Sequence, residues 1–177
     1  MSFVIWLTGL PCSGKTTIAQ NLYRYFKSKN RKVEVIDGDV IRQYISKGLG
    51  FSREDRFENI RRVSFLANIL SRNDVIAIVA VISPYREMRK MARDMVESPF
   101  VEVFVNAPIE VCKQRDVKGM YKKAEMGQIK GFTGVDDPYE PPENPEVECR
   151  TDIETVEQST NKIIDFVKRM GYYKEDV

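Results

Sequence analysis

The segment at 9–16, which reads Gly-Leu-Pro-Cys-Ser-Gly-Lys-Thr, limits the possible folds of this chain more than any other stretch. It fits the pattern G-x-x-x-x-G-K-[ST], between an apolar run at 3–7 and a helical pattern that begins at 18, which is the context a P-loop requires. In such a loop, backbone N–H groups surround one phosphate, Lys15 neutralises the outer phosphates and the Thr16 hydroxyl binds Mg²⁺. We therefore predict that ATP and Mg²⁺ bind at this loop, which consists of Gly9, Leu10, Pro11, Cys12, Ser13, Gly14, Lys15, Thr16 and Thr17.

Strand-like and helix-like segments alternate along the rest of the chain. We predict strands at about 3–8, 32–36, 75–82, 100–105 and 147–150, and helices at about 15–29, 40–47, 53–72, 85–97, 108–115 and 155–171. Such alternation predicts an α/β P-loop NTPase fold with a parallel sheet and helices on both faces. With 177 residues, the chain is most simply a single kinase-like domain over 1–177.

Composition excludes several classes of function. The chain has no histidine, so it cannot contain a Ser-His-Asp triad or a histidine-based zinc site. Its net charge of +2 is too small to indicate a nucleic-acid partner. No apolar run is long enough to span a membrane, and the first predicted strand leaves no room for a signal peptide. Three cysteines without a pattern indicate a reduced, cytoplasmic protein.

Three polar clusters follow strands that are expected to be parallel, and so they should meet at one edge of the sheet. They are the P-loop, the Asp-Gly-Asp turn at 37–39, and Ser83-Pro84 with Arg86. Arg56 and Asn59 lie on the otherwise apolar stripe of the helix predicted at 53–72. Because buried polar groups need polar partners, we expect this turn to border a pocket, or Arg56 to form a structural ion pair.

These clusters favour a kinase that acts on a small molecule. A transducing NTPase usually has an acidic residue after a central strand, but the strand predicted at 75–82 ends in Ile-Ser-Pro. The acids follow the second strand instead, where Asp37 or Asp39 could orient an acceptor hydroxyl and take its proton. Residues 117–145 are rich in lysine, glycine and proline, and we predict a mobile, nucleoside-kinase-like lid at about 117–135.

The sequence resembles the adenylylsulfate kinase family of P-loop kinases over nearly its whole length. Besides the P-loop, the resemblance is carried by 36–39 (Ile-Asp-Gly-Asp), 49–52 (Leu-Gly-Phe-Ser), 58–63 (Glu-Asn-Ile-Arg-Arg-Val), 82–86 (Ile-Ser-Pro-Tyr-Arg) and 129–140 (Ile-Lys-Gly-Phe-Thr-Gly-Val-Asp-Asp-Pro-Tyr-Glu). It implies transfer of the ATP γ-phosphate to the 3′-hydroxyl of adenylyl sulfate, in sulfate activation and assimilation. It also implies a homodimer and, as a possible partner, a separate ATP sulfurylase.

The resemblance further implies roles for individual residues. Phe51 and Phe132 would enclose the adenine of adenylyl sulfate, and Asp39 would contact its 3′-hydroxyl. Arg115 would lie against the adenine of ATP, and Asp37 would reach the metal ion through water. The remaining acceptor-site positions are Arg42, Arg56, Asn59, Ile82, Ser83 and Lys118.

Ser83 matches a family position described as a phosphoserine intermediate. No residue of the sequence is evidently placed to activate its hydroxyl, and direct transfer needs only positioning and charge stabilisation. An N-cap role for Ser83 before Pro84 is the alternative. For the whole protein, the alternatives are another P-loop metabolite kinase and a nucleotide-binding regulatory subunit without turnover.

Overall fold

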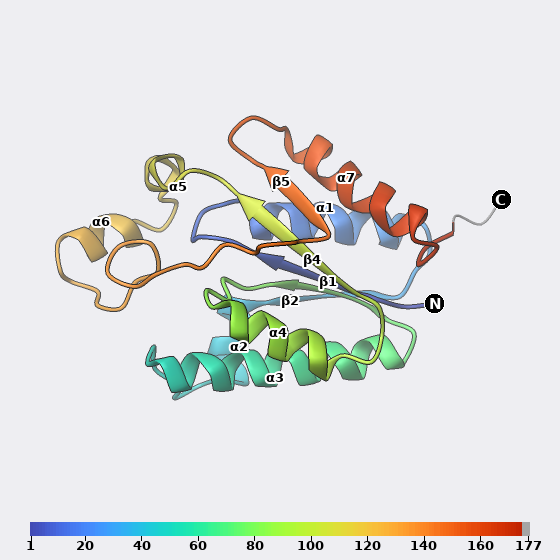
Figure 1. Cartoon of the computed structure of the whole chain (residues 1–177), viewed down its shortest axis with the longest axis horizontal. Coiled ribbons are helices and arrows are strands. Elements are labelled where there is room, and N and C mark those ends of the chain that lie inside the picture. Colours follow the sequence, from blue (N-terminus) through green and yellow to red (C-terminus); the bar gives the residue numbers. More distant parts are fainter. Residues whose placement is uncertain (175–177) are drawn as a thin grey trace.

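A five-stranded parallel sheet forms the centre of the computed structural model, which describes residues 1–174. The strand order is β2-β3-β1-β4-β5, and each neighbouring pair is parallel (Figure 1). This arrangement confirms the predicted α/β class. The strands are β1 Val4–Thr8, β2 Val33–Asp37, β3 Ile76–Ala80, β4 Phe100–Asn106 and β5 Val147–Arg150.

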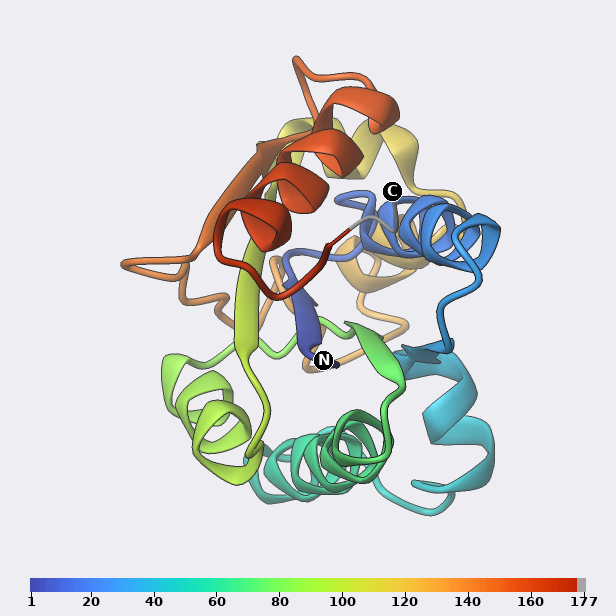
Figure 2. The same ribbon diagram turned by 90° about the vertical axis from the view of Figure 1, so that its right-hand side faces the viewer.

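Helices cover both faces of this sheet, as the sequence predicts. Helices α1 (Lys15–Ser28) and α7 (Val156–Arg169) lie on one face, and α3 (Arg53–Arg72) and α4 (Arg86–Met95) lie on the other (Figures 1 and 2). The shorter helices are α2 (Gly38–Tyr44), α5 (Ile109–Arg115) and α6 (Met120–Glu125). Within residues 1–174, no helix combines the length and apolar character needed to cross a bilayer.

Each face of the sheet has its own hydrophobic core because successive side chains of a strand point to opposite faces. In β1, Ile5 and Leu7 join the core beneath α1 and α7, whereas Val4 and Trp6 join the core beneath α3 and α4. All four side chains are fully buried. A central strand that is buried on both faces explains why the sequence shows a continuous apolar run before the P-loop.

Three differences between the predicted elements and the structure concern the carboxyl edge of the sheet and the lid. The strand predicted at 75–82 ends at Ala80, so Ile82 and Ser83 lie in the following loop. The helix predicted at 40–47 begins already at Gly38, because the Asp37 carboxylate accepts hydrogen bonds from the Asp39 and Val40 amides and caps it. The 117–145 connection also contains α6, a six-residue helix that was not predicted.

Candidate active site

The polar clusters predicted from the sequence meet at the carboxyl edge of the sheet. The P-loop follows β1, Asp37 ends β2, and Ser83 follows β3. Thr151, which sequence reasoning missed, directly follows β5 at the same edge. The rule that ligands bind beyond the carboxyl ends of parallel strands could have identified Thr151, although no motif contains it.

Close packing against β4 requires glycine at the start of the P-loop. A Cβ atom at Gly9 would overlap the carbonyl oxygen of Val105 and would lie 2.7 Å from Ser13 Oγ. Gly14, the N-cap of α1, has a φ of 108°, in the left-handed region that favours glycine. The two glycines therefore allow the loop to pack on β4 and to turn into α1 with its backbone N–H groups available for an anion.

Lys15 lies folded against the loop that it belongs to. Its Nζ atom donates hydrogen bonds of 2.8 Å to the carbonyl oxygens of Gly9 and Leu10. Burial lowers the pKa of this ammonium group to about 8, partly offset by the nearby carboxylates of Asp39 and Asp37. A partly buried cation with only neutral hydrogen-bond partners is suited to take an anionic ligand, so its position fits binding of the outer phosphates.

Thr16 and Asp37 form a candidate Mg²⁺ site. The Thr16 hydroxyl lies 3.3 Å from Asp37 Oδ2, while Asp37 Oδ1 is fixed by the Asp39 amide at 2.9 Å. Among the described residues, no group of three cysteine or carboxylate side chains is close enough to hold a metal. One hydroxyl and one carboxylate suit Mg²⁺, which is usually bound by few protein ligands together with phosphates and water.

Asp39 is exposed and faces the lid. Its carboxylate forms an ion pair with Lys118, which precedes α6. The hydrogen bond that the Lys118 ammonium group donates to Asp39, together with the attraction of the carboxylate charge, raises the pKa of Lys118. The structure thus brings together two residues, 79 positions apart in the sequence, that were both predicted to contact the acceptor.

Ser83 has a structural role that sequence reasoning missed. Its side chain is 2% exposed, and its Oγ atom accepts a 3.1 Å hydrogen bond from the indole N–H of the buried Trp6. The residue also adopts a φ of 44°, and its carbonyl oxygen accepts a 2.6 Å bond from Arg89. The N-cap alternative is wrong, because α4 is preceded by Tyr85 as N-cap, without a side-chain cap.

Arg42 and Phe51 lie together at the outer end of the site. Phe51 is 62% exposed, and the Arg42 guanidinium carbon lies 4.4 Å from the centre of its ring. Arg42 also donates a 2.9 Å hydrogen bond to the Gly50 carbonyl oxygen. An exposed ring with a cation on one face remains available on the other for stacking, as the predicted role of Phe51 requires.

The inward polar turn of α3 contains one satisfied and one unsatisfied side chain. Arg56 is 7% exposed and forms the ion pair that was its structural alternative, at 2.9 Å from Asp137. Asn59 is 6% exposed, and its Oδ1 atom has no hydrogen-bond partner. Because unpaired buried polar atoms are costly, Asn59 fits a pocket that receives a polar ligand, while the substrate role of Arg56 stays a prediction.

Phe132 packs against a small hydrophobic cluster beneath the lid. Its ring meets Tyr121 edge-to-face at 5.0 Å, and the cluster also contains Cys112 and Ala107. The segments of Phe132 and Phe51 are linked through Arg56, which donates hydrogen bonds to the carbonyl oxygens of Gly131 and Phe51.

Two further arginines bind backbone segments together. Arg115 Nη1 donates to the carbonyl oxygens of Cys12 and Ser13 at 3.2 Å, and Arg115 Nη2 donates to that of Thr151 at 2.7 Å. This network joins the P-loop to the loop after β5, so Arg115 lies on the donor side of the site, where its predicted contact with ATP would be. Arg86 donates a 2.8 Å hydrogen bond to the Pro141 carbonyl oxygen and also pairs with Glu143 at 3.2 Å.

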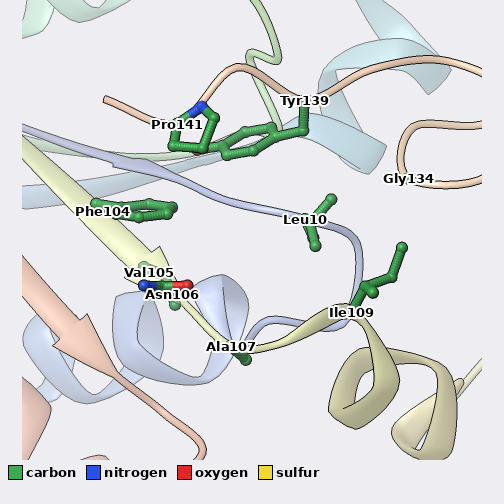
Figure 3. A pocket seen from close by; sticks show the side chains of 9 residues that line it. All are labelled: Leu10, Phe104, Val105, Asn106, Ala107, Ile109, Gly134, Tyr139 and Pro141. Carbon is green, nitrogen blue, oxygen red and sulfur yellow. The ribbon is translucent and has the colours of Figure 1, made fainter. Parts of the chain in front are cut away.

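A cavity of about 270 Å³ lies beside the P-loop, between the end of β4 and the segment 136–146, which connects the lid to β5 (Figure 3). Its walls are mostly apolar, so it does not suit phosphate groups. Of the residues predicted to bind substrates, Leu10 lines it. The full lining consists of Leu10, Phe104, Val105, Asn106, Ala107, Ile109, Gly134, Tyr139 and Pro141.

Comparisons with known proteins show which family this chain resembles. The family model for adenylylsulphate kinase matches residues 1–150. An adenylyl-sulfate kinase of Rippkaea orientalis is 56% identical over 173 residues, which cover 98% of this chain and 95% of the relative.

Solved structures show the same similarity in three dimensions. The chain superposes with a TM-score of 0.92 on the adenylylsulfate (APS) kinase CysC of Mycobacterium tuberculosis in complex with AMPPNP and APS, at 37% identity, covering 94% of this chain and 98% of that one. A gluconokinase of Sinorhizobium meliloti, at 14% identity and a TM-score of 0.62, covers 97% of this chain and 93% of its own and shares the fold alone.

Proposed function

The chain belongs to the adenylylsulphate kinase family, and we propose from its site how it transfers the γ-phosphate of ATP to the 3′-hydroxyl of adenylyl sulfate. The products are 3′-phosphoadenylyl sulfate and ADP, so the enzyme is an ATP-dependent phosphotransferase with an alcohol acceptor, acting in sulfate activation. The observation that carries the proposal is the 3.3 Å approach of Thr16 to Asp37, with Asp39 two residues further on. It brings metal-binding and acceptor-binding groups next to one phosphate loop.

On the donor side, the loop amides and Lys15 would hold the outer phosphates of ATP. Lys15 would exchange its bonds to the Gly9 and Leu10 carbonyls for phosphate oxygens, and so gain a charged partner. Arg115 would lie against the adenine. Thr16 and, through water, Asp37 would hold Mg²⁺, which would supply positive charge to offset that of the phosphates.

On the acceptor side, Phe51 and Phe132 would enclose the adenine of adenylyl sulfate. Asn59, with its unpaired Oδ1, would receive a hydrogen bond from the substrate, while Arg42 and Lys118 would offset its negative charge. Asp39 would orient the 3′-hydroxyl and take its proton onto a carboxylate oxygen. Lys118 would leave its ion pair with Asp39 as the hydroxyl arrives, because both compete for the same carboxylate.

We propose direct transfer between the two nucleotides, without a phosphoserine at Ser83. The Ser83 hydroxyl is buried and bound to Trp6, which leaves it poorly placed to attack the γ-phosphate. Direct transfer requires in-line positioning and charge stabilisation, and the residues described above supply both. Closure of the lid at about 117–135 would exclude water, which otherwise would hydrolyse ATP.

An assay of ATP-dependent formation of the 3′-phosphorylated product tests the proposal. We expect turnover with adenylyl sulfate, none with nucleoside monophosphates or gluconate, and none after Mg²⁺ is removed with a chelator. Preferred turnover of a nucleoside monophosphate or gluconate would identify another metabolite kinase. Binding of ATP without transfer to any acceptor would identify a regulatory subunit.

We further propose a cytoplasmic homodimer that receives adenylyl sulfate from a separate ATP sulfurylase. The three cysteines are free, which fits a reducing compartment. Adenylyl sulfate must come from a reaction that joins sulfate to an adenylyl group, and a sulfurylase catalyses such a reaction. Light scattering at micromolar concentration tests the dimer, and a monomer under those conditions would contradict it.

A further inference from the structure

Two adjacent aspartates control the loop that carries Phe132, and they act in different ways. Asp136 shapes the loop from within, because its two carboxylate oxygens accept hydrogen bonds of 2.7 Å from the Gly131 and Phe132 amides. These bonds lower the pKa of the Asp136 carboxyl group. Both bonds lie within the segment 131–136, so Asp136 stabilises the turn itself.

Asp137 points instead to the body of the protein. Its Oδ2 atom lies 2.9 Å from Arg56 Nη1 and accepts a 3.0 Å hydrogen bond from the Tyr85 hydroxyl. Arg56 belongs to α3 and Tyr85 caps α4, so one carboxylate joins the loop to two helices. The loop's own backbone adds a bridge between Thr133 and Asp137, and the Gly134 amide donates a 2.8 Å bond to the Asp137 carbonyl oxygen.

The buried charge of the Arg56 guanidinium makes its contact with Asp137 important for stability. Its side chain is 8% exposed, so the charge needs a partner, and Asp137 supplies it. Arg56 also donates hydrogen bonds to the Phe51 carbonyl oxygen at 2.8 Å and to Thr133 Oγ1 at 3.0 Å. Asp137 therefore completes a chain of contacts that runs from Phe51 through Arg56 to the loop of Phe132.

We propose that Asp137 is a positioning residue of the acceptor site, which docks the Phe132 loop onto Arg56 and Tyr85. It touches no substrate. It sets the distance between the Phe132 loop and Phe51, and so determines the affinity for the acceptor nucleotide. The role in acceptor affinity rests on the proposed function, whereas the docking of the loop does not.

The test compares Asp137→Asn with Asp94→Asn, a matched control on α4 whose carboxylate is 60% exposed and pairs with Lys90. Because charge-assisted bonds to a buried group are lost, we expect the KM for adenylyl sulfate to rise about tenfold or more in Asp137→Asn. The KM for ATP should stay within about twofold of wild type, because Asp137 contacts Arg56 and Tyr85 on the acceptor side of the site. Asp94→Asn should match wild type in both constants.

A second measurement reports docking without any reaction. Trypsin should cut after the exposed Lys130 several times faster in Asp137→Asn than in wild type, because the adjoining loop is released. Cutting after Arg24, within α1, should not change, which separates release of the loop from loss of the fold. Tyr85→Phe, which removes only the hydroxyl, should show the same pattern to a smaller extent.

Two results would overturn the proposal. One is unchanged cleavage after Lys130 in Asp137→Asn, which would show that the loop is held by other contacts. The other is faster cleavage with an unchanged KM for adenylyl sulfate, or an equal rise of the KM for both substrates. If wild-type protein phosphorylated no adenylyl sulfate, the proposed function would fail, and the trypsin comparison alone would still decide whether Asp137 docks the loop.

Discussion

At the scale of single residues, the site contains polar groups that lower the stability of the fold and increase the affinity for a ligand. Lys15 is the clearest case, because its ammonium group is surrounded by carbonyl oxygens and burial lowers its pKa to about 8. Asn59 Oδ1 is buried without a partner. Such groups reduce stability in the absence of ligand, and a ligand that satisfies them gains correspondingly.

Lys15→Met should abolish turnover and stabilise the fold without ligand. A pKa lowered from 10.5 to about 8 means that folding disfavours the charged ammonium group by about 3 kcal/mol. Methionine removes this cost, but the Gly9 and Leu10 carbonyl oxygens then lose their hydrogen bonds from Lys15, which offsets part of the gain. We therefore expect a free energy of unfolding about 1–2 kcal/mol higher than that of wild type at pH 7, measured by urea denaturation.

The pH dependence of this gain has a definite sign. In wild type the unfolded chain binds more protons than the folded one between pH 8 and 10.5, so wild-type stability rises with pH through that window. The difference between Lys15→Met and wild type should shrink at pH 9.5 or so. Wild-type turnover in the variant would refute the assignment of the P-loop, and a constant difference would refute the buried charge.

Phe132→Leu should weaken the binding of adenylyl sulfate more than the binding of ATP. Leucine keeps part of the packing against Tyr121 but cannot stack on adenine, and stacking on an aromatic ring is worth about 1–3 kcal/mol per base. We expect the KM for adenylyl sulfate to rise at least fivefold or so, with the KM for ATP nearly constant. Phe65→Leu, at a 56% exposed position on α3, serves as control. An equal loss for both substrates would exclude the stacking role.

At the scale of secondary-structure elements, one side chain both starts a helix and serves the site. The Asp37 carboxylate caps α2 with one oxygen and faces Thr16 with the other. This double use ties the geometry of the candidate Mg²⁺ site to the start of the helix. It also explains why the predicted turn at 37–39 is already helical.

Substitutions at Asp37 should separate the two uses. Asparagine caps helices as well as aspartate does, so Asp37→Asn should leave thermal stability nearly unchanged while it raises the Mg²⁺ concentration needed for half-maximal rate. Asp37→Ala loses both roles and should be less stable by about 1 kcal/mol. If Asp37→Asn kept the wild-type Mg²⁺ dependence, the metal role of Asp37 would be wrong.

At the scale of the whole molecule, the site joins parts of the chain that are held by two separate cores. The P-loop leads into α1 on one face of the sheet, whereas α3 and α4 lie on the opposite face (Figure 2). Arg56 belongs to α3, and Tyr85 is the N-cap of α4. A ligand that contacts both sides should therefore stabilise the molecule as a unit. Ligands that bind only the folded state raise its stability by mass action.

The non-hydrolysable ATP analogue AMPPNP should raise the melting temperature in the presence of Mg²⁺. At a ligand concentration about 100 times the Kd, the gain is about 2.7 kcal/mol, or roughly 5–10 °C for a domain of this size. Without Mg²⁺ the shift should be clearly smaller, and in Lys15→Met it should nearly disappear. Differential scanning calorimetry measures all three conditions, and equal shifts with and without Mg²⁺ would contradict the metal site.

The sequence by itself determined the class of fold, the phosphate loop and the family. These follow from local patterns: apolar runs of strand length, helical stripes, and glycines that only a few backbone geometries require. The inward position of Arg56 and Asn59 was also visible, because helical spacing alone places them on the buried stripe of α3.

Only the tertiary structure decided what those polar groups contact. The bond between Ser83 and Trp6 spans 77 positions and that between Arg56 and Thr133 also spans 77, while the ion pair of Lys118 with Asp39 spans 79. No local pattern encodes such pairs, since they arise when parallel strands bring distant loops to one edge of the sheet. The phosphate loop could therefore be predicted from the sequence. The contacts of Asp137 with Arg56 and Tyr85 could not, because they form only when the fold places the loop of Phe132 against α3 and the N-cap of α4.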